Sequence, residues 1–364
     1  MGLAVAVLAA LPSVVGALPA ADTGASAADL RRAVLASGDV AFSGYAQAAG
    51  GLDLPVSDQL TDVADLFSDR TTMRAWYRGP EDWRVDVVWP TGETGVHADA
   101  EGSWTWDYEA ATATRTAPTP LALPAASDLL PSALGRRLLA EAADDELSRL
   151  GAERIAGRDA LGLRLVPTEE ASSVARVDVW VDGGTGLPLR VQVFGEDADA
   201  EPALDTAFLD LELTTPPAEV IAFDVPPGAD VRQGQAAQLL QAAARAGADD
   251  GPIPLPAELT GLPRRIIDGA PQTVGVYGRG VTLLAVSPIP RRVAGGLRDA
   301  IAAAPEAVVD SLGLRISAGP LGLMLVRGPD GPVLLAGTVS LDALAGAAAE
   351  LTAAAEQAGA GGDR

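Results

Sequence analysis

The sequence predicts a protein that is mainly β with α (α+β), built on a strongly curved, antiparallel half-barrel sheet covered by helices. A small C-terminal α+β domain follows it. Three observations predict this fold. Residues 74–108 hold five tryptophans in runs that alternate with a period of two. Further alternating runs continue to residue 213, with helical spacing in only two places. After residue 265, strand and helix patterns recur on a smaller scale.

The chain begins with an uncharged apolar run over residues 2–18, ahead of a polar tract of small residues. Such a run is typical of the hydrophobic part of a secretory signal, and its length is also at the lower limit for a membrane span. A buried N-terminal helix is the alternative. We expect residues 1–28 to be a signal peptide or an N-terminal membrane anchor, which predicts an extracytoplasmic protein, exported or tethered to the cell membrane.

The large domain is expected over residues 29–230. Residues 29–37 have the spacing of a short amphipathic helix that starts at Asp29, residues 40–45 begin the first strand, and residues 50–72 are irregular. The tryptophan-rich stretch follows, with turn-forming residues at 79–82 and at 99–102. Its apolar positions alternate with polar ones in two runs: Trp83, Val85, Val87, Trp89, and then Trp104, Trp106, Tyr108. This pattern predicts an antiparallel meander with an unusually aromatic inner surface.

Helical and strand patterns then succeed each other. Residues 116–127 are rich in proline and alanine, and leucines at helical spacing predict one or two helices across 128–149. Alternation resumes on both sides of a strong hairpin turn at 182–188. The apolar positions of these strands are Leu161, Leu163, Leu165, Val177, Val179, Val181, Leu189, Val191, Val193, Leu209, Leu211 and Leu213.

The C-terminal part divides into a helix and linker at 231–265, a small α+β domain at 266–358, and a disordered tail at 359–364. Within the small domain the expected helices are 292–303 and 341–357. The expected strands are 273–277, 281–286, 314–317, 321–326 and 333–338. The sequence Gly278-Arg279-Gly280 is a fragment of a glycine-rich motif, and we interpret it as the turn between the first two strands.

Charge and residue types exclude several classes of function. With 49 acidic and 26 basic residues, the net charge of −23 makes nucleic acid and anionic headgroups poor general partners, although a local arginine patch could override this. The chain lacks cysteine and lysine, which excludes disulfides, a Walker A loop and Schiff-base chemistry. His97 is the one histidine, and no G-x-S-x-G motif accompanies it. We expect no enzyme activity, cofactor or metal, a calcium site on the acidic runs 144–146 and 249–250 being a weaker alternative.

Several short blocks occur in a recognisable order. They are residues 42–44 (FSG), 73–80 (MRAWYRGP), 83–85 (WRV), 103–107 (SWTWD), 155–158 (IAGR), 179–182 (VWVD) and 186–191 (GLPLRV). Over about residues 29–230 these blocks resemble the MucB/RseB and LolA superfamily, in particular its large actinobacterial members. Residues 276–281 (VYGRGV) are similar to the smaller C-terminal domain of the RseB type.

The resemblance implies an unclosed, bent sheet with helices in its concavity, an extracytoplasmic location and a non-enzymatic role. LolA-like members carry acylated lipoproteins, and mycobacterial relatives carry complex lipids. RseB-like members bind the outer part of an anti-sigma factor and restrain its proteolysis. The superfamily is functionally broad, so the resemblance predicts the fold more sharply than the cargo.

Two functional hypotheses follow. In the first, the protein binds or senses a lipid or an acylated lipoprotein, whose acyl chains lie in an aromatic-lined hollow and gain about 0.8 kcal/mol per buried methylene. The residues expected to line that hollow are Trp76, Trp83, Val85, Val87, Trp89, Trp104, Trp106, Val177, Val179, Val191 and Val193. In the second, it is an RseB-like negative regulator that binds the extracytoplasmic segment of an anti-sigma factor. Both hold if lipid occupancy switches partner binding.

Overall fold

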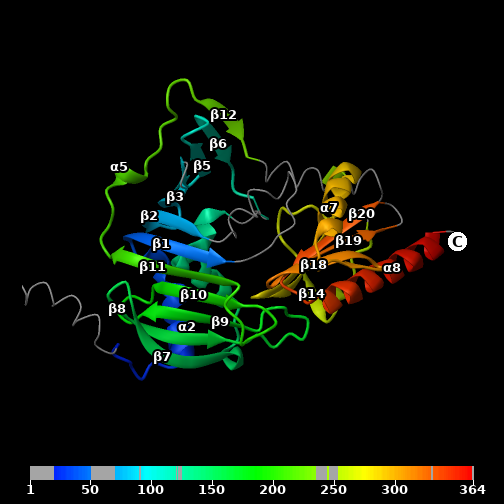
Figure 1. The fold of residues 1–364 in the computed structure, drawn as a ribbon, viewed down its shortest axis with the longest axis horizontal. Helices are drawn as coiled ribbons and strands as arrows, with labels where there is room; N and C mark the ends of the chain where they lie inside the picture. Colours follow the sequence, from blue (N-terminus) through cyan, green and yellow to red (C-terminus); the bar gives the residue numbers. More distant parts are fainter. Residues whose placement is uncertain are drawn as a thin grey trace, which may run out of the picture.

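Two β-sheets, each with its own helices, make up the protein (Figure 1). The large sheet is coloured blue to green in Figure 1, and the small sheet beside it is coloured yellow to red. The computed structural model describes residues 20–50, 70–89, 92–119, 121, 125–234, 244–245, 253–328 and 331–362.

Within the described residues, twelve strands form the large sheet in the order β12-β6-β5-β4-β3-β2-β1-β11-β10-β9-β8-β7. All neighbours pair antiparallel except β12, which runs parallel to β6. The strands are β1 Phe42–Gly50, β2 Thr71–Gly79, β3 Asp82–Trp89, β4 Gly92–Asp99, β5 Gly102–Asp107, β6 Thr112–Thr116, β7 Leu147–Ile155, β8 Arg158–Leu165, β9 Arg176–Asp182, β10 Pro188–Phe194, β11 Leu204–Glu212 and β12 Asp230–Gln233.

The tryptophan-rich stretch forms the consecutive strands β2, β3, β4 and β5, as its alternation predicted. The turn into β5 depends on Gly102, whose φ is +133°. A Cβ there would lie 2.3 Å from the carbonyl oxygen of Thr116, so a side chain at this position would displace β6. The short turns hold the four strands in one antiparallel meander.

Helices cover one face of the large sheet, which we call the inner face. They are α2 Ala27–Ala36, η1 Ser37–Asp39, η2 Ala126–Leu129, α4 Pro131–Leu139 and η3 Asp144–Glu146. A capping box starts α2: the Ser26 hydroxyl accepts from the Asp29 N–H at 3.1 Å, and the Asp29 carboxylate accepts from the Ser26 N–H at 3.2 Å. Leu30 and Val34 of α2 and Leu139 of α4 are buried in one core with the inner face.

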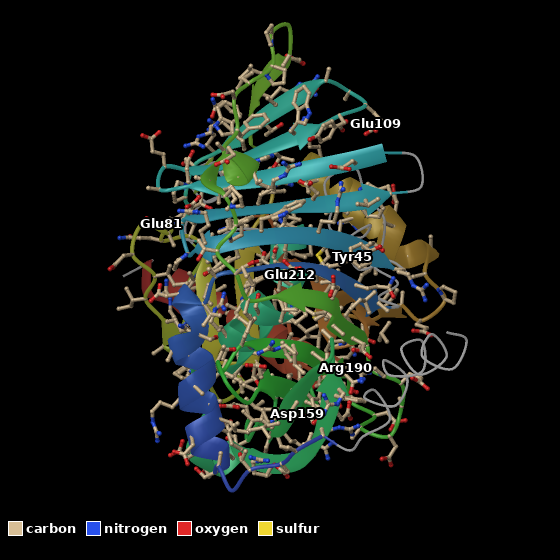
Figure 2. The ribbon with its side chains drawn as sticks, turned by 90° about the vertical axis from the view of Figure 1, so that its left-hand side faces the viewer. Tyr45, Glu81, Glu109, Asp159, Arg190 and Glu212 are labelled. Carbon is tan, nitrogen blue, oxygen red and sulfur yellow. The ribbon has the colours of Figure 1, made fainter. Side chains whose placement is uncertain are left out.

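The opposite, outer face carries ion pairs between neighbouring strands, such as Arg164 with Asp178 at 2.6 Å and Arg190 with Asp205 at 2.5 Å. A segment over residues 213–233, which we call the strap, leaves β11 and crosses the outer face of β2–β4. It contains the short helix α5 Ala218–Ile221 and ends as β12. In Figure 2, α5 is the green helix in front of the blue-green strands.

Within the described residues, eight strands form the small sheet in the order β13-β14-β15-β16-β20-β19-β18-β17. Helix α7, Arg291–Ala303, and helix α8, Leu341–Gly362, pack against it. The strands are β13 Glu258–Leu259, β14 Leu262–Arg265, β15 Gly275–Arg279, β16 Thr282–Pro288, β17 Val308–Val309, β18 Gly313–Ala318, β19 Leu321–Arg327 and β20 Pro332–Gly337.

The predicted fold class is confirmed: a large, curved, open sheet with helices on one face, followed by a smaller α+β unit. Some boundaries differ. Residues 147–155 form β7, where we predicted the end of a helical region. Residues 230–233, 258–259 and 262–265 form strands, where we predicted the domain edge and the linker. Helix α8 reaches Gly362, past the predicted start of the tail.

Some predictions lie outside the described residues, including the apolar run 2–18 and most of the predicted helix at 235–245. Among the residues that the structure describes, no helix has the length and apolar character needed to cross a membrane. The division into domains at the predicted boundaries stays a prediction.

Candidate functional site

The inner face brings together eight of the eleven residues predicted to line the hollow. Val85, Val87, Val177, Val179, Val191 and Val193 are buried in its core, and Trp83 and Trp89 are partly buried against it. The valines face one another across strands, because Val191 pairs with Val179 and Val193 with Val177. This face is therefore a continuous apolar surface, as the alternation predicted.

Side chains of the chain itself occupy the concavity of this face. Val177, Val179 and Val191 are 0% exposed, and Leu139 of α4, packed in the same core, is also 0% exposed. Leu30, Val34 and Leu129 complete the cover. A lipid could reach these valines only if α2 and α4 moved, since the surface is already removed from water.

Trp76, Trp104 and Trp106 lie on the outer face instead. Cross-strand partners share a face, and the register pairs Trp76 with Arg84, Arg84 with His97, and His97 with Trp104. Val85, one residue after Arg84, points to the inner face. The eleven predicted side chains therefore do not share one surface, and their role in ligand binding stays a prediction.

Two of the outer-face tryptophans, Trp104 and Trp106, face the strap. The ring of Phe223 lies 5.8 Å from that of Trp104 and 6.2 Å from that of Trp106, measured between centroids, and 4.9 Å from the imidazole of His97. Arg115 covers Trp104 with its guanidinium 5.3 Å from the ring. Trp104 and Trp106 thus contact the strap, with Trp106 buried and Trp104 and Phe223 partly exposed.

Backbone carbonyls of the strap accept hydrogen bonds from the outer face. Arg84 donates to Val220 at 3.2 Å, and Nδ1 of His97 lies 2.7 Å from the carbonyl oxygen of Ile221. Because a carbonyl only accepts, Nδ1 of His97 carries the proton. Burial lowers the pKa of His97 below its ordinary value, and the nearby Arg84 adds to this, against the raising effect of the Ile221 carbonyl. This histidine is a buried structural donor, not an exposed base.

A buried carboxylate lies next to this histidine. Asp86 is 0% exposed and accepts two hydrogen bonds from Arg84, both at 2.7 Å. Arg74 lies 3.8 Å from the same carboxylate and also pairs with Glu93. Such a bidentate pair compensates the desolvation of the buried charge. Sequence reasoning missed this cluster. It also missed Phe223, whose partner Trp104 is distant in sequence.

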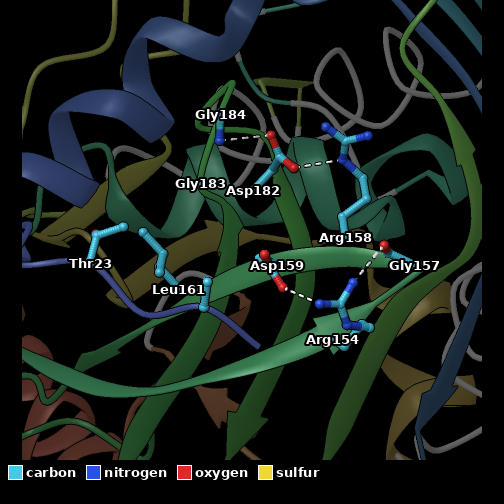
Figure 3. Close-up of a pocket in the computed structure, with 10 residues that line it drawn as sticks. Thr23, Arg154, Gly157, Arg158, Asp159, Leu161, Asp182, Gly183 and Gly184 are labelled. Atoms are coloured by element: carbon cyan, nitrogen blue, oxygen red, sulfur yellow. Dashed lines mark hydrogen bonds and ion pairs between the residues drawn. The ribbon is translucent and has the colours of Figure 1, made fainter. Parts of the chain in front are cut away.

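A cavity of about 410 Å³ lies at the turn between β9 and β10 (Figure 3). Two ion pairs line it, Arg154 with Asp159 at 2.7 Å and Arg158 with Asp182 at 2.6 Å. Burial would raise the pKa of Asp182, but hydrogen bonds from Arg158 and Thr185 outweigh it and hold the pKa below its ordinary value. Each arginine is neutralised by an acid, so these pairs stabilise the turn and provide no reactive group.

The two sheets meet through ion pairs at Glu141 and Glu146. Arg279, the last residue of β15, donates to both Glu146 oxygens at 3.0 and 2.9 Å, and Arg265 pairs with Glu141 at 2.7 Å. Burial would raise the pKa of Glu146, but the hydrogen bonds from Arg279 and two backbone N–H groups outweigh it and lower the pKa.

Apolar contacts reinforce this junction. Val281 belongs to the core of the large sheet, and Ala171 belongs to the core of the small one. Within the described residues, no group of three or more histidines and carboxylates has the arrangement of a metal site.

Comparison with known proteins finds a family match over part of the chain and a similar fold over most of it. Residues 114–227 match the MucB/RseB N-terminal domain. A chain in the complex of Pseudomonas aeruginosa MucA/MucB is 17% identical, with 88% of this chain and 96% of that chain covered and a TM-score of 0.50. MucB in complex with MucA(peri) is also 17% identical, with 88% of this chain and 97% of that chain covered and a TM-score of 0.49. A LolA superfamily protein from Nitrosomonas europaea is 12% identical, with 55% of this chain and 99% of that chain covered and a TM-score of 0.28. No curated protein matches the chain.

A curved open sheet with helices in its concavity, followed by a smaller α+β unit, defines a MucB-like class of fold. The family match over residues 114–227 agrees with the resemblance that the sequence blocks of this region indicated, and the similarity to MucB shows a common fold.

Proposed function

We propose that this protein is a non-enzymatic, extracytoplasmic regulator that binds the outer segment of a membrane protein, of the kind that RseB-like proteins bind in an anti-sigma factor. One observation carries the proposal. The similarity to a chain of the MucA/MucB complex covers 96% of that chain and 88% of this one, a share that extends over both sheets. Superfamily members are binding or regulatory proteins outside the cytoplasm, which supports both the proposed regulatory role and the proposed extracytoplasmic location.

The geometry of the inner face supports a protein partner over a carried lipid. The valines at the centre of that face have no exposed surface, and α2 and α4 occupy the concavity. Polar and apolar contacts also join the two sheets, so a partner segment could bind both at once. A regulator needs such an extended surface more than it needs an empty cavity.

Peptides that tile the extracytoplasmic segments of the host's anti-sigma factors would test this proposal. Each fluorescent peptide is titrated with the purified protein, and anisotropy reports binding. We expect one segment to bind one-to-one with a micromolar or lower Kd, and its scrambled version to bind at least about tenfold more weakly. Absence of binding across the whole set would contradict the proposal.

Lipid or lipoprotein binding is the second candidate, and the apolar inner face favours it. Trp83 and Trp89 are only partly buried, so they are the predicted hollow residues that an acyl chain could reach first. The two faces provide a matched pair of variants. If lipid binds in the concavity, Trp83→Ala reduces uptake of a fluorescent fatty acid and Trp106→Ala does not. Equal effects of both variants, or none, would contradict binding at this face.

A further inference from the structure

The strap is held on the outer face of the large sheet by few buried side chains. Between residues 213 and 233, only Pro216 and Ile221 are buried, Phe223 is partly buried, and all four residues of β12 are exposed. Figure 1 shows the strap leaving β11, passing through α5 and ending at β12. A segment with so little buried surface opens at a lower cost in free energy than the domain that it covers.

The main chain of the strap accepts the hydrogen bonds that the sheet donates. Arg78 donates to the carbonyl oxygen of Pro216 at 2.6 Å, as Arg84 and His97 donate to carbonyl oxygens of α5. A carboxylate of the sheet holds each of the two arginines, at 2.7 Å in both cases. Every peptide has carbonyl groups, so these donors fit any segment that follows the same path and do not require the sequence of this one.

Two side chains of the strap make its apolar contacts with the sheet. Ile221 is 2% exposed, and the ring of Phe223, two residues later, contacts the rings of His97, Trp104 and Trp106. The residue between them has an extended backbone, with ψ at 142°. A segment that fits this surface therefore needs an aliphatic residue followed, two positions later, by an aromatic one.

The strap ends as the edge strand of the large sheet. Four residue pairs join β12 to β6 in parallel, from Asp230 with Thr112 to Gln233 with Arg115. Without β12, the outer edge of β6 would present unpaired N–H and C=O groups, which favour the addition of another strand. A segment that replaces the strap can therefore add to the same edge, running parallel to β6.

We propose that the strap is an internal ligand, and that the surface beneath it binds an extended segment of a protein partner once the strap is displaced. This surface, which we call the strap site, consists of Arg78, Arg84, His97, Trp104 and Trp106 with the edge of β6. Because its two arginines pair with carboxylates of the sheet, main-chain and ring contacts select the segment, and charge does not. The identity of the partner rests on the function proposed above, whereas the strap site itself does not.

Displacement of the strap sets the affinity for the partner. A tethered segment has an effective concentration on the order of millimolar, so a free segment displaces the strap only when it forms more contacts. The apparent dissociation constant of the partner rises as the fraction of molecules with an open strap falls. Weakening the strap should therefore tighten partner binding, which is the opposite of what loss of a direct contact does.

A peptide with the sequence of residues 214–225, TTPPAEVIAFDV, is the probe for the strap site. It is labelled with a fluorophore and titrated with the full protein, and anisotropy reports binding. We expect the double variant Ile221→Ala with Phe223→Ala to bind the peptide at least about tenfold more tightly than the unaltered protein, because its own strap competes less. Phe223→Ala alone, at a partly exposed side chain, should give a smaller gain.

Two control variants and a control peptide locate the binding. Val225→Ala with Val231→Ala truncates strap side chains that are 38% and 53% exposed, and should leave the affinity of the unaltered protein unchanged. Trp104→Ala, added to the double variant, should reverse most of the gain, because it removes a ring that contacts the phenylalanine of the strap. A peptide with alanine in place of its phenylalanine should bind the double variant at least about tenfold more weakly.

Anti-sigma factor segments, tested on the same variants, separate the strap site from the function proposed above. A segment that binds the double variant at least about tenfold more tightly than the unaltered protein occupies the strap site. A segment that binds both proteins equally lies elsewhere, which contradicts the strap site as the place of the partner and leaves the proposed function intact. If the strap peptide binds as expected and no anti-sigma factor segment binds, the proposed function is contradicted and the strap site is not.

Two results with the strap peptide would overturn the proposal. The first is that the peptide binds the double variant no more tightly than it binds the unaltered protein. The second is that Trp104→Ala leaves the gain unchanged, which would place the peptide outside the strap site. Thermal unfolding of every variant verifies that each protein is folded.

Discussion

The two faces of the large sheet are stabilised by different kinds of interaction. On the inner face, valines such as Val85 and Val179 are buried against leucines of α2 and α4. On the outer face, arginines pair with carboxylates on neighbouring strands, and the strap covers the aromatic part. Apolar burial is non-directional and tolerates rearrangement, whereas charge pairs require defined geometry. The inner face therefore supplies stability, and the outer face fixes the register and the path of the strap.

The largest effect that would test this comparison is expected at Arg84. Arg84→Met leaves the fully buried Asp86 without its bidentate partner, which should cost about 3–5 kcal/mol of the free energy of unfolding. Urea unfolding followed by tryptophan fluorescence measures it. Adding Asp86→Leu should recover most of the loss, because no buried charge then remains. A loss below about 1 kcal/mol for Arg84→Met would contradict the importance of this pair.

The inner face is tested at Leu139, which fills the concavity from α4 and is 0% exposed. Leu139→Ala should cost about 2–5 kcal/mol, because it removes buried methyl groups and leaves a cavity. The matched control is Leu209→Ala, at a side chain that is 53% exposed, for which we expect a change within about 0.5 kcal/mol. Equal effects at both sites would mean that α4 does not fill the concavity in solution.

A smaller effect is expected where the strap meets the sheet. Phe223→Ala removes ring contacts with His97, Trp104 and Trp106 and should cost about 1–2 kcal/mol. Hydrogen exchange of the amides in residues 214–224 should become faster, and the tryptophan emission should shift to the red. Unchanged exchange would show that the hydrogen bonds from Arg78, Arg84 and His97 hold the strap without the ring contacts.

The smallest expected effect is the pH dependence of the free energy of unfolding that His97 causes. Its folded-state pKa lies below the ordinary value of 6.5, so the unfolded chain binds more protons around that pH. The contribution of His97 to the free energy of unfolding is present above pH 6.5, and it is lost as the pH falls through the lower, folded-state pKa. The lowered pKa values of Asp182 and Glu146 act at more acidic pH, below that of an ordinary carboxylate. His97→Gln should flatten the first step only, measured by urea unfolding between pH 7 and 5.

The sequence predicted most of this fold because its strands alternate strongly and its turns contain glycine and proline. Within β3 the alternation assigned Trp83, Val85, Val87 and Trp89 to one face. Alternation alone does not predict which residues of neighbouring strands share a face, because this depends on turn length and register. Trp104 therefore shares a face with Arg84 and not with Val85.

The strap was the other feature that the sequence did not predict. Residues 213–233 have little periodicity, and Phe223 contacts Trp104 across more than a hundred positions of chain. Only the folded arrangement brings them together. A lone aromatic residue in a proline-bounded, irregular segment was the one available signal, and it did not identify a partner.

The central claim is that this protein binds a protein segment and fills its own concavity. Native mass spectrometry of the protein, purified from a host that contains membranes, tests it most directly. We expect the mass of the chain alone, with extraction by organic solvent yielding no stoichiometric lipid. A one-to-one complex with a lipid that persists through purification would contradict the claim and favour the carrier or lipid-sensing function.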